Sequence, residues 1–143
     1  MSELSGDAIL SLPVRLHGIE LGRPVDLLLD RESLRVVGLD VLCGDEVHRF
    51  LPLPTAVVAE DGLKIHSPLV LLEEDELGFY RARAFTLTSL RGKAVTKDGR
   101  SVGTLRDVVF APNGEMVAVL LESGDRLPYE DTLRLPPASR TAA

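Results

Sequence analysis

Three histidines, one cysteine and a run of carboxylates are the residues of this chain that could bind a metal or do chemistry. His17, His48 and His66 contain no His-x-His or His-x-x-x-His pair, so the local spacing of metal ligands is absent. The acidic run Glu73–Glu76 lacks the alternating Asp, Asn and Gly of a calcium loop, and a solvated connector is the favoured interpretation. Cys43 is a single thiol, whereas a cysteine-based zinc site needs at least two. We therefore predict no metal and no cofactor.

An alternative interpretation gives these residues a binding role. All three histidines fall in the first half of the chain, and a barrel could bring them together, so a small-ligand or metal-binding barrel using His17, His48, His66 or the acidic residues stays open. Small barrels are filled by their own side chains, which argues against it. Arg81 and Arg83 alternate along a predicted strand near Phe79 and Phe85 and could bind a phosphate or carboxylate; an exposed, charged strand is the simpler interpretation.

Motifs of catalysis and of nucleotide binding are missing. The chain has no Gly-x-Ser-x-Gly, no Gly-x-Gly-x-x-Gly and no Walker-type Gly-Lys-Ser/Thr segment. The formal net charge is −6, whereas nucleic-acid binders usually present a basic face. Aromatic residues make up only 4% of the chain and tryptophan is absent, which leaves few platforms for stacking bases. We predict a non-catalytic protein that does not bind nucleic acid.

The apolar runs are too short to cross a membrane. The longest is Met116–Leu121, and a spanning helix needs about 20 apolar residues. The acidic N-terminus also lacks the basic and apolar regions of a signal peptide. These features predict a cytoplasmic protein without a membrane span.

The elements that must position these residues are strands. Val14 and Leu16 alternate with polar neighbours, as in a half-buried strand, while 36–42 and 116–121 are apolar runs typical of central strands. Glycine and proline recur every eight to twelve residues, which is typical of sandwiches and barrels. No window shows a helical apolar stripe, and at most one helical turn is expected, near Glu130–Leu133. The predicted class is all-β.

An internal repeat organises the chain. A shift of 81 residues aligns identical residues in the two halves, and these are Val14 with Val95, Gly18 with Gly99, Gly22 with Gly103 and Asp26 with Asp107. After the loss of one residue, Gly44 and Asp45 align with Gly124 and Asp125. We predict a first repeat over 1–75, a second over 76–135 and a flexible tail over 136–143. The paired aspartates are expected at the surface or as acceptors of backbone N–H groups in a neighbouring turn.

The second repeat resembles the PRC-barrel family. The resemblance rests on Leu90–Val95, Asp98–Gly103 and Leu105–Phe110, followed by the apolar run 116–121 and by Leu127–Glu130. It covers about residues 87–135, and residues 9–57 resemble the family more weakly, because Ser11 stands where the family has a glycine. The resemblance implies two small PRC-type β-barrels packed together. It also implies an adaptor role. Members of the family include the C-terminal domain of a ribosome-maturation factor and the cytoplasmic domain of the photosynthetic reaction-centre H subunit, and neither of these roles transfers to this chain residue by residue.

The two repeats differ most in one hairpin. Residues 45–52 are four longer than their counterpart and carry Val47, His48, Phe50 and Leu51, which we take as candidate partner-binding residues. The alternative is that the hairpin covers the core. The resulting hypothesis is a protein–protein adaptor whose partner is another protein or a second copy of the chain. We also expect the two halves to unfold together, because each is marginal alone.

Overall fold

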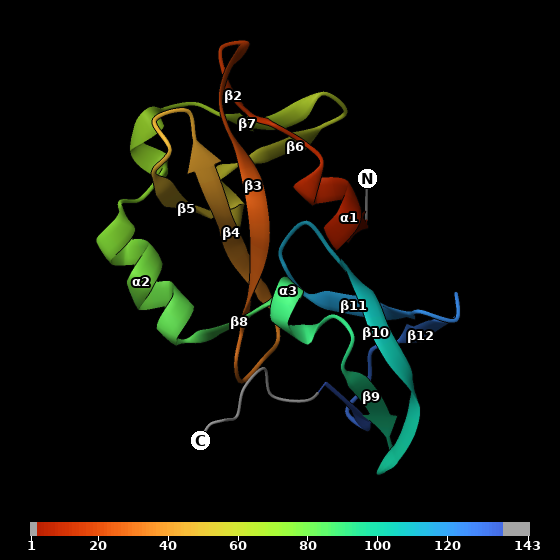
Figure 1. Cartoon of the computed structure of the whole chain (residues 1–143). Coiled ribbons are helices and arrows are strands. Elements are labelled where there is room, and N and C mark those ends of the chain that lie inside the picture. The colour runs from red at the N-terminus through yellow and green to blue at the C-terminus, as the bar shows by residue number, and fades with distance from the viewer. Residues whose placement is uncertain (1–2, 136–143) are drawn as a thin grey trace.

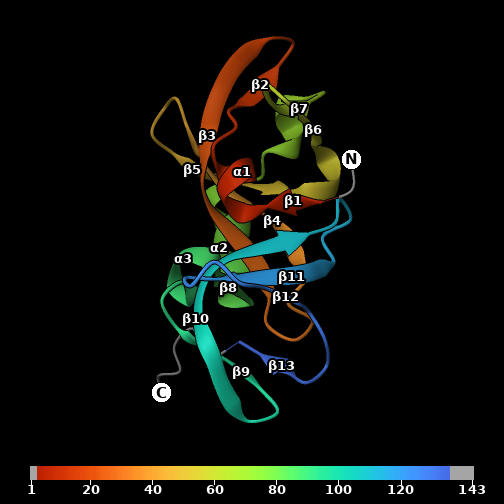
Figure 2. The same cartoon turned by 90° about the vertical axis from the view of Figure 1, so that its right-hand side faces the viewer.

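Strands dominate the computed structural model, which describes residues 3–135. They form a seven-stranded sheet, the first sheet, built mainly from the first half of the chain, and a six-stranded second sheet built mainly from the second half. Figure 1 shows the first-half strands (red to yellow) above the second-half strands (cyan to blue), and Figure 2 shows the same stacking from the side. The all-β prediction is thus confirmed in its broad form.

The first sheet has the strand order β5-β4-β3-β2-β7-β6, and β8 also pairs with β3. Its strands are β2 (Val14–Leu16), β3 (Ile19–Asp30), β4 (Val36–Cys43), β5 (His48–Pro52), β6 (Val57–Ala59), β7 (Gly62–Ile65) and β8 (Ala84–Thr86). The second sheet has the order β12-β11-β10-β9-β13, and β1 also pairs with β10. Its strands are β1 (Leu4–Ser5), β9 (Ala94–Lys97), β10 (Arg100–Phe110), β11 (Met116–Leu121), β12 (Arg126–Pro128) and β13 (Leu133–Arg134). The helices are α1 (Gly6–Leu10), α2 (Glu74–Ala82) and α3 (Leu87–Leu90), with 3-10 segments η1 (Leu53–Thr55) and η2 (Pro68–Val70).

Each sheet is organised around one long strand, β3 or β10. In both halves this strand pairs with the strand before it, β2 or β9, and with the strand after it, β4 or β11. The runs predicted as central strands, now β4 and β11, each have neighbours on both sides. The two halves therefore share this pattern of strand pairing.

The two halves exchange short segments. β1 lies at the start of the chain but pairs with β10 of the second sheet, where Leu4 is opposite Phe110. β8 lies in the second half, ahead of the long strand β10, but pairs with β3 of the first sheet, where Phe85 is opposite Leu29. Because the same shift of 81 residues relates both pairs, the exchange is reciprocal. Each half completes the sheet of the other.

A short helix follows each exchanged strand and begins in the same way. The Ser5 hydroxyl accepts a hydrogen bond from the Ala8 amide at 3.1 Å at the start of α1. The Thr86 hydroxyl accepts one from the Ser89 amide at 3.2 Å at the start of α3. Such N-caps satisfy amides that the first helical turn leaves without partners. Each exchanged strand therefore leads directly into a capped helix.

The helical content corrects the sequence-based expectation. Residues 130–133 form no helix, whereas three α-helices occur elsewhere in the described residues. α2 covers 74–82, so Arg81 lies on a helix and the strand predicted through Arg81 and Arg83 is wrong. The Glu73 side chain and the Glu76 side chain form a reciprocal capping box at the start of α2. This box stabilises the helix despite its weakly apolar sequence.

The main hydrophobic core is shared by both sheets. One continuous cluster of buried side chains includes Leu27 and Leu39 of the first sheet and Val108 and Val119 of the second. A smaller cluster of Leu28, Phe50, Leu77 and Ala84 lies under α2. Since burial of apolar side chains is the dominant stabilising term, the core joins the halves energetically.

Strand pairing follows an open path in both sheets, and neither sheet closes into a ring within residues 3–135. The arrangement as two barrels stays a prediction, and so do the boundaries 1–75 and 76–135. Residues 136–143, predicted as a flexible tail, lie outside the described residues. No helix in the described part of the chain is both long and apolar enough to span a membrane.

Candidate docking site

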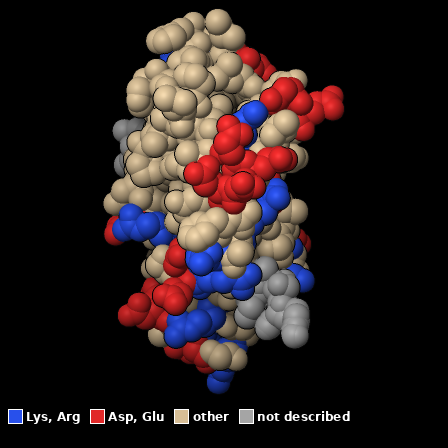
Figure 3. All heavy atoms as spheres, turned by 90° about the vertical axis from the view of Figure 1, so that its left-hand side faces the viewer, with Lys and Arg blue, Asp and Glu red and all other residues tan. Residues whose placement is uncertain are grey.

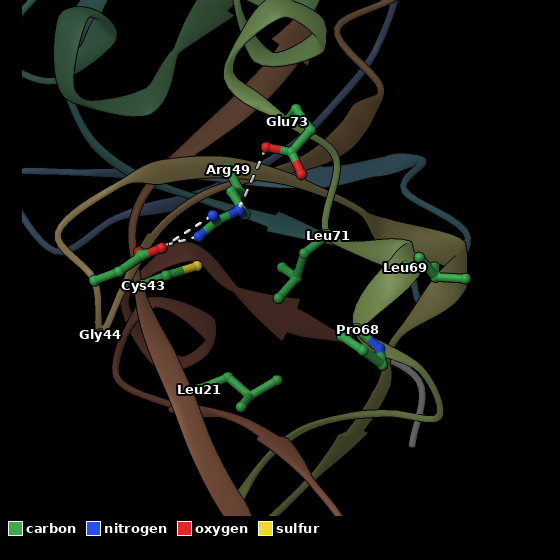
Figure 4. A pocket seen from close by; sticks show the side chains of 9 residues that line it. Leu21, Cys43, Gly44, Arg49, Pro68, Leu69, Leu71 and Glu73 are labelled. Carbon is green, nitrogen blue, oxygen red and sulfur yellow. Dashed lines mark hydrogen bonds and ion pairs between the residues drawn. The ribbon is translucent and has the colours of Figure 1, made fainter.

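A hollow of about 420 Å³ opens at the end of β4, on the first half of the molecule. Its walls are mostly apolar and come from β3, from the end of β4 and from the segment of η2. The lining residues are Leu21, Cys43, Gly44, Asp45, Arg49, Pro68, Leu69, Leu71 and Glu73. Figure 4 shows Leu21, Leu71 and Pro68 around the opening, with Arg49 on one wall. We call this cavity the first hollow.

Among the described residues that line the first hollow, Arg49 is the cation, and its guanidinium pairs with acidic side chains. Its two terminal nitrogens donate to the two carboxylate oxygens of Asp45 at 3.1 and 3.0 Å. Its Nε lies 3.9 Å from Glu73 Oε1, as the dashed lines in Figure 4 indicate. The hydrogen bonds from Arg49 hold the pKa of Asp45 below its ordinary value, and those to Asp45 raise the pKa of Arg49. The charge of Arg49 is therefore balanced by carboxylates within the wall of the hollow.

Leu69 stands at the mouth of the first hollow with 85% of its surface exposed. Its position follows from local sequence, because the Ser67 hydroxyl accepts a hydrogen bond from the Leu69 amide at 3.1 Å and Pro68 occupies the first turn of η2. Leu71, two residues later, is buried and anchors the segment. A rigid turn thus presents a leucine to solvent.

A second hollow of about 470 Å³ adjoins the first and shares Leu21, Cys43 and Gly44 with it. It adds Val25, which is 42% exposed, and Leu42, which is 37% exposed. The apolar lining therefore continues from η2 across the end of β4 to β3. We use the name docking face for the surface formed by Leu21, Val25, Leu42, Cys43, Pro68 and Leu69.

The docking face has an acidic border. Asp45 and Glu73 line the first hollow, and their neighbours in the sequence, Glu46 and Glu74–Glu76, are exposed as well. Within the described residues no ion pair joins Glu46, Glu74 or Asp75 to a cation. Figure 3 shows acidic side chains (red) gathered beside a wide surface without charged residues (tan) on the side of the molecule that carries α2.

The hairpin residues singled out from the sequence divide into two kinds. Phe50 is 1% exposed and Leu51 is fully buried, so both belong to the core. Val47 and His48 are half-buried and accessible. The covering role that we considered for this hairpin therefore describes Phe50 and Leu51. A partner-binding role stays a prediction, and only Val47 and His48 offer surface for it.

His48 belongs to a polar cluster that fixes α2 to the first sheet. Its Nδ1 lies 2.8 Å from Oδ1 of Asp40, which is 3% exposed, and the other oxygen of Asp40 accepts a hydrogen bond from Arg81. Next to them the Tyr80 ring stacks on Phe50 at 4.3 Å. A buried carboxylate needs such partners to offset its loss of hydration. His48 therefore has a structural role.

The three histidines lie on separate elements. His17 is in the turn between β2 and β3, His48 is in β5 and His66 follows β7. Among residues 3–135 there is no group of three or more His, Cys, Asp or Glu side chains that could hold a metal ion. The proposed arginine pair also separates, because Arg81 pairs with Asp40 whereas the Arg83 guanidinium lies over the Phe79 ring at 3.8 Å.

Sequence reasoning missed the segment that forms one wall of the first hollow. Residues 53–72 contain η1, β6, β7 and η2, whereas in the described part of the second half only β13 follows β12, and it takes the place beside β9 that β7 takes beside β2. A signal was present, because Ser67-Pro68 is the start signature of a helical turn and an apolar residue follows it directly. This signature lies in a part of the first half that does not align with the second half.

Comparison with known proteins gives one distant relative. No family model matches the chain. The chain is 29% identical over 111 residues to the ribosome maturation factor RimM of Corynebacterium efficiens. The match covers 76% of this chain and 58% of that protein, so the chain spans less than two thirds of its relative. This similarity supports the PRC-barrel resemblance in part.

Proposed function

We propose that this protein is a non-catalytic adaptor of ribosome maturation that binds another protein through the docking face. The observation that carries the proposal is Leu69, an almost fully exposed leucine at the mouth of an apolar hollow. Contiguous exposed apolar surface on a soluble domain typically marks an interaction site. The similarity to a ribosome maturation factor supports the cellular process, and ribosome assembly would place the protein in the cytoplasm.

A protein partner fits the docking face better than a small ligand. Pockets for small molecules place a few polar groups so that they converge on the ligand. In the first hollow the charged side chains of Asp45, Arg49 and Glu73 instead pair with one another. The remaining lining is apolar and suits a side chain inserted from another chain. The net charge of −6 and the acidic border also favour a protein over RNA.

The fold would serve this role as a rigid support. We propose that each half is a PRC-type unit, and that the exchanged segments β1–α1 and β8–α3 join the units into one body. Only the first unit carries residues 53–72, so only this unit has the docking face. In a duplicated protein, the copy that diverges is free to acquire the binding role.

Co-sedimentation with ribosomal particles tests the proposal. The full chain, Leu69→Ser and the control Val57→Ser are each mixed with ribosomal particles from the source cells and separated on a sucrose gradient. Val57 is a suitable control because it is 67% exposed and lines neither hollow. We expect the wild type and Val57→Ser to travel with the particles and Leu69→Ser to remain at the top. Absence of wild-type co-sedimentation, or equal co-sedimentation of Leu69→Ser, would overturn the proposal.

A further inference from the structure

The charges around the docking face point to the chemistry of its partner. Asp45 and Glu73 line the first hollow, and the residues next to them in the chain, Glu46, Glu74, Asp75 and Glu76, are exposed carboxylates. Arg49 is the cation that lines the first hollow, and it is held by Asp45 and Glu73. The border therefore has a strong excess of negative charge. An acidic partner would be repelled, whereas lysine and arginine side chains would be attracted.

The hollows define a second requirement. Leu21, Cys43, Pro68, Leu69 and Leu71 form walls that offer a bound group apolar contact. A leucine or phenylalanine side chain inserted there would remove both its own surface and that of Leu69 from water. The continuation of the apolar lining past Leu42 extends this contact toward β3.

From these two features we infer that the docking face binds a segment of a protein in which a large apolar side chain is flanked by lysine or arginine. The apolar side chain enters the first hollow, and the basic side chains lie against the acidic border. This inference rests on the proposed function for the existence of a protein partner, and it adds the chemistry of the segment that is bound.

The second half supplies an internal comparison. At the positions equivalent to Leu21, Cys43 and Asp45 it has Val102, Ser123 and Asp125. Asp125 accepts a hydrogen bond from the Ser123 hydroxyl at 3.1 Å, and up to residue 135 the chain after β12 contains only the short strand β13 where the first half has η1, β6, β7 and η2. The carboxylate survives in the second half, but the apolar wall does not. Binding is therefore expected at the first half alone.

Three synthetic peptides separate the two requirements. The first has a central Leu-Leu pair flanked by lysines, the second has the same pair flanked by glutamates, and the third has Ser-Ser flanked by lysines. Binding of each fluorescent peptide to the full chain is measured by anisotropy at low and at high salt. We expect only the first peptide to bind, and its affinity to fall as salt rises, because exposed charges are screened.

Variants of the chain then locate the site. Leu69→Ser should weaken binding of the Lys-flanked Leu-Leu peptide about tenfold, since it removes one buried apolar contact. The double variant Glu74→Gln, Asp75→Asn should weaken it about threefold and reduce its salt dependence. These two carboxylates avoid the capping box of Glu73 and Glu76. Val57→Ser and Glu122→Gln, at exposed positions outside both hollows, are the matched controls and should leave binding unchanged.

The results distinguish this inference from the proposed function. Equal binding of the glutamate-flanked and lysine-flanked Leu-Leu peptides, no binding of the latter, or binding insensitive to Leu69→Ser would overturn the inference. Co-sedimentation with ribosomal particles that depends on Leu69 would leave the proposed function standing in each of these cases. Peptide binding as expected without any co-sedimentation would uphold the partner chemistry and overturn the role in ribosome maturation.

Discussion

Asp26 and Asp107 occupy equivalent positions in the two halves, and each accepts a hydrogen bond from a short helix of the other half. Asp107 Oδ2 accepts a hydrogen bond from the Asp7 amide in α1 at 3.0 Å. Asp26 Oδ1 accepts one from the Thr88 amide in α3 at 3.1 Å. A carboxylate at a helix N-terminus both satisfies an orphan amide and complements the helix dipole. The aspartates therefore hold the exchanged segments in place; each accepts a backbone N–H group from a helix of the other half, where the sequence suggested a neighbouring turn.

Replacement of Asp107 should destabilise the protein more than replacement of Asp26. Asp107 is 1% exposed and also accepts from the Val108 amide at 2.8 Å, so Asp107→Ala leaves buried donors without partners. We expect a loss of about 3 kcal/mol in the free energy of unfolding, against about 1 kcal/mol for Asp26→Ala, where water can reach. Urea unfolding measures both values. Equal losses would show that Asp107 does not hold α1 as described.

The contact between the halves can be tested at a glycine. Gly114 has φ +94°, and a Cβ there would lie 2.3 Å from the Val36 carbonyl oxygen across the contact between the halves. Gly124 has φ +98° but no atom within 4 Å of such a Cβ. Both substitutions to alanine cost about 1 kcal/mol for the backbone conformation, and Gly114→Ala should cost about 2 kcal/mol more. If the two variants unfold at the same urea concentration, the contact near Val36 is not as close as described.

Phe50→Ala distinguishes a core residue from an interface residue. The Phe50 side chain is 1% exposed, and its ring stacks on Tyr80. Its removal should therefore cost about 3–5 kcal/mol of stability, as emptying a buried aromatic site usually does. Thermal or urea unfolding measures the loss. A variant as stable as wild type would return Phe50 to the list of partner-binding residues.

The ion pair in the first hollow predicts a pH dependence. The pKa of Asp45 in the folded protein is held below the ordinary value of 3.8, chiefly by the hydrogen bonds from Arg49. A depressed carboxylate pKa stabilises the fold above the unfolded value, and this contribution is lost as the pH falls through the folded value. Asp45→Asn should therefore lower the unfolding midpoint at about pH 6, and the difference from wild type should shrink as the pH falls below the ordinary value of 3.8. An unfolding difference that persists unchanged at acidic pH would contradict this role of Asp45.

The strand pattern was predictable, whereas the exchange between the halves was not. Alternation around Val14 and the apolar run of β11 report burial of one or both faces, which is a local property of the sequence. The shift of 81 residues aligns Leu4 with Phe85. An alignment does not show, however, which sheet each of these edge strands joins. Which sheet receives β1 or β8 depends on tertiary packing between the halves.

The candidate site was predictable only in part, for a similar reason. The sequence directed attention to the longer hairpin, but the two faces of β5 bury Phe50 under α2 and Leu51 in the main core. The exposed leucine of the docking face follows Ser67-Pro68, where a turn outside the repeat projects it. Helix α2 was missed because its apolar stripe is weak and its stability comes from the capping box and from the contact of Arg81 with Asp40. Those interactions are visible only once the chain is folded.

Alkylation of Cys43 tests the docking face most directly. Cys43 is the single cysteine of the chain, is 8% exposed and lines both hollows, so its reaction with N-ethylmaleimide reports whether they are occupied. The variant Val57→Cys adds a reference thiol outside them, and mass spectrometry follows both sites in the same sample. In the fraction bound to ribosomal particles, we predict that alkylation slows at Cys43 and is unchanged at position 57. Equal alkylation of Cys43 in the free and the bound chain would contradict the proposed docking face.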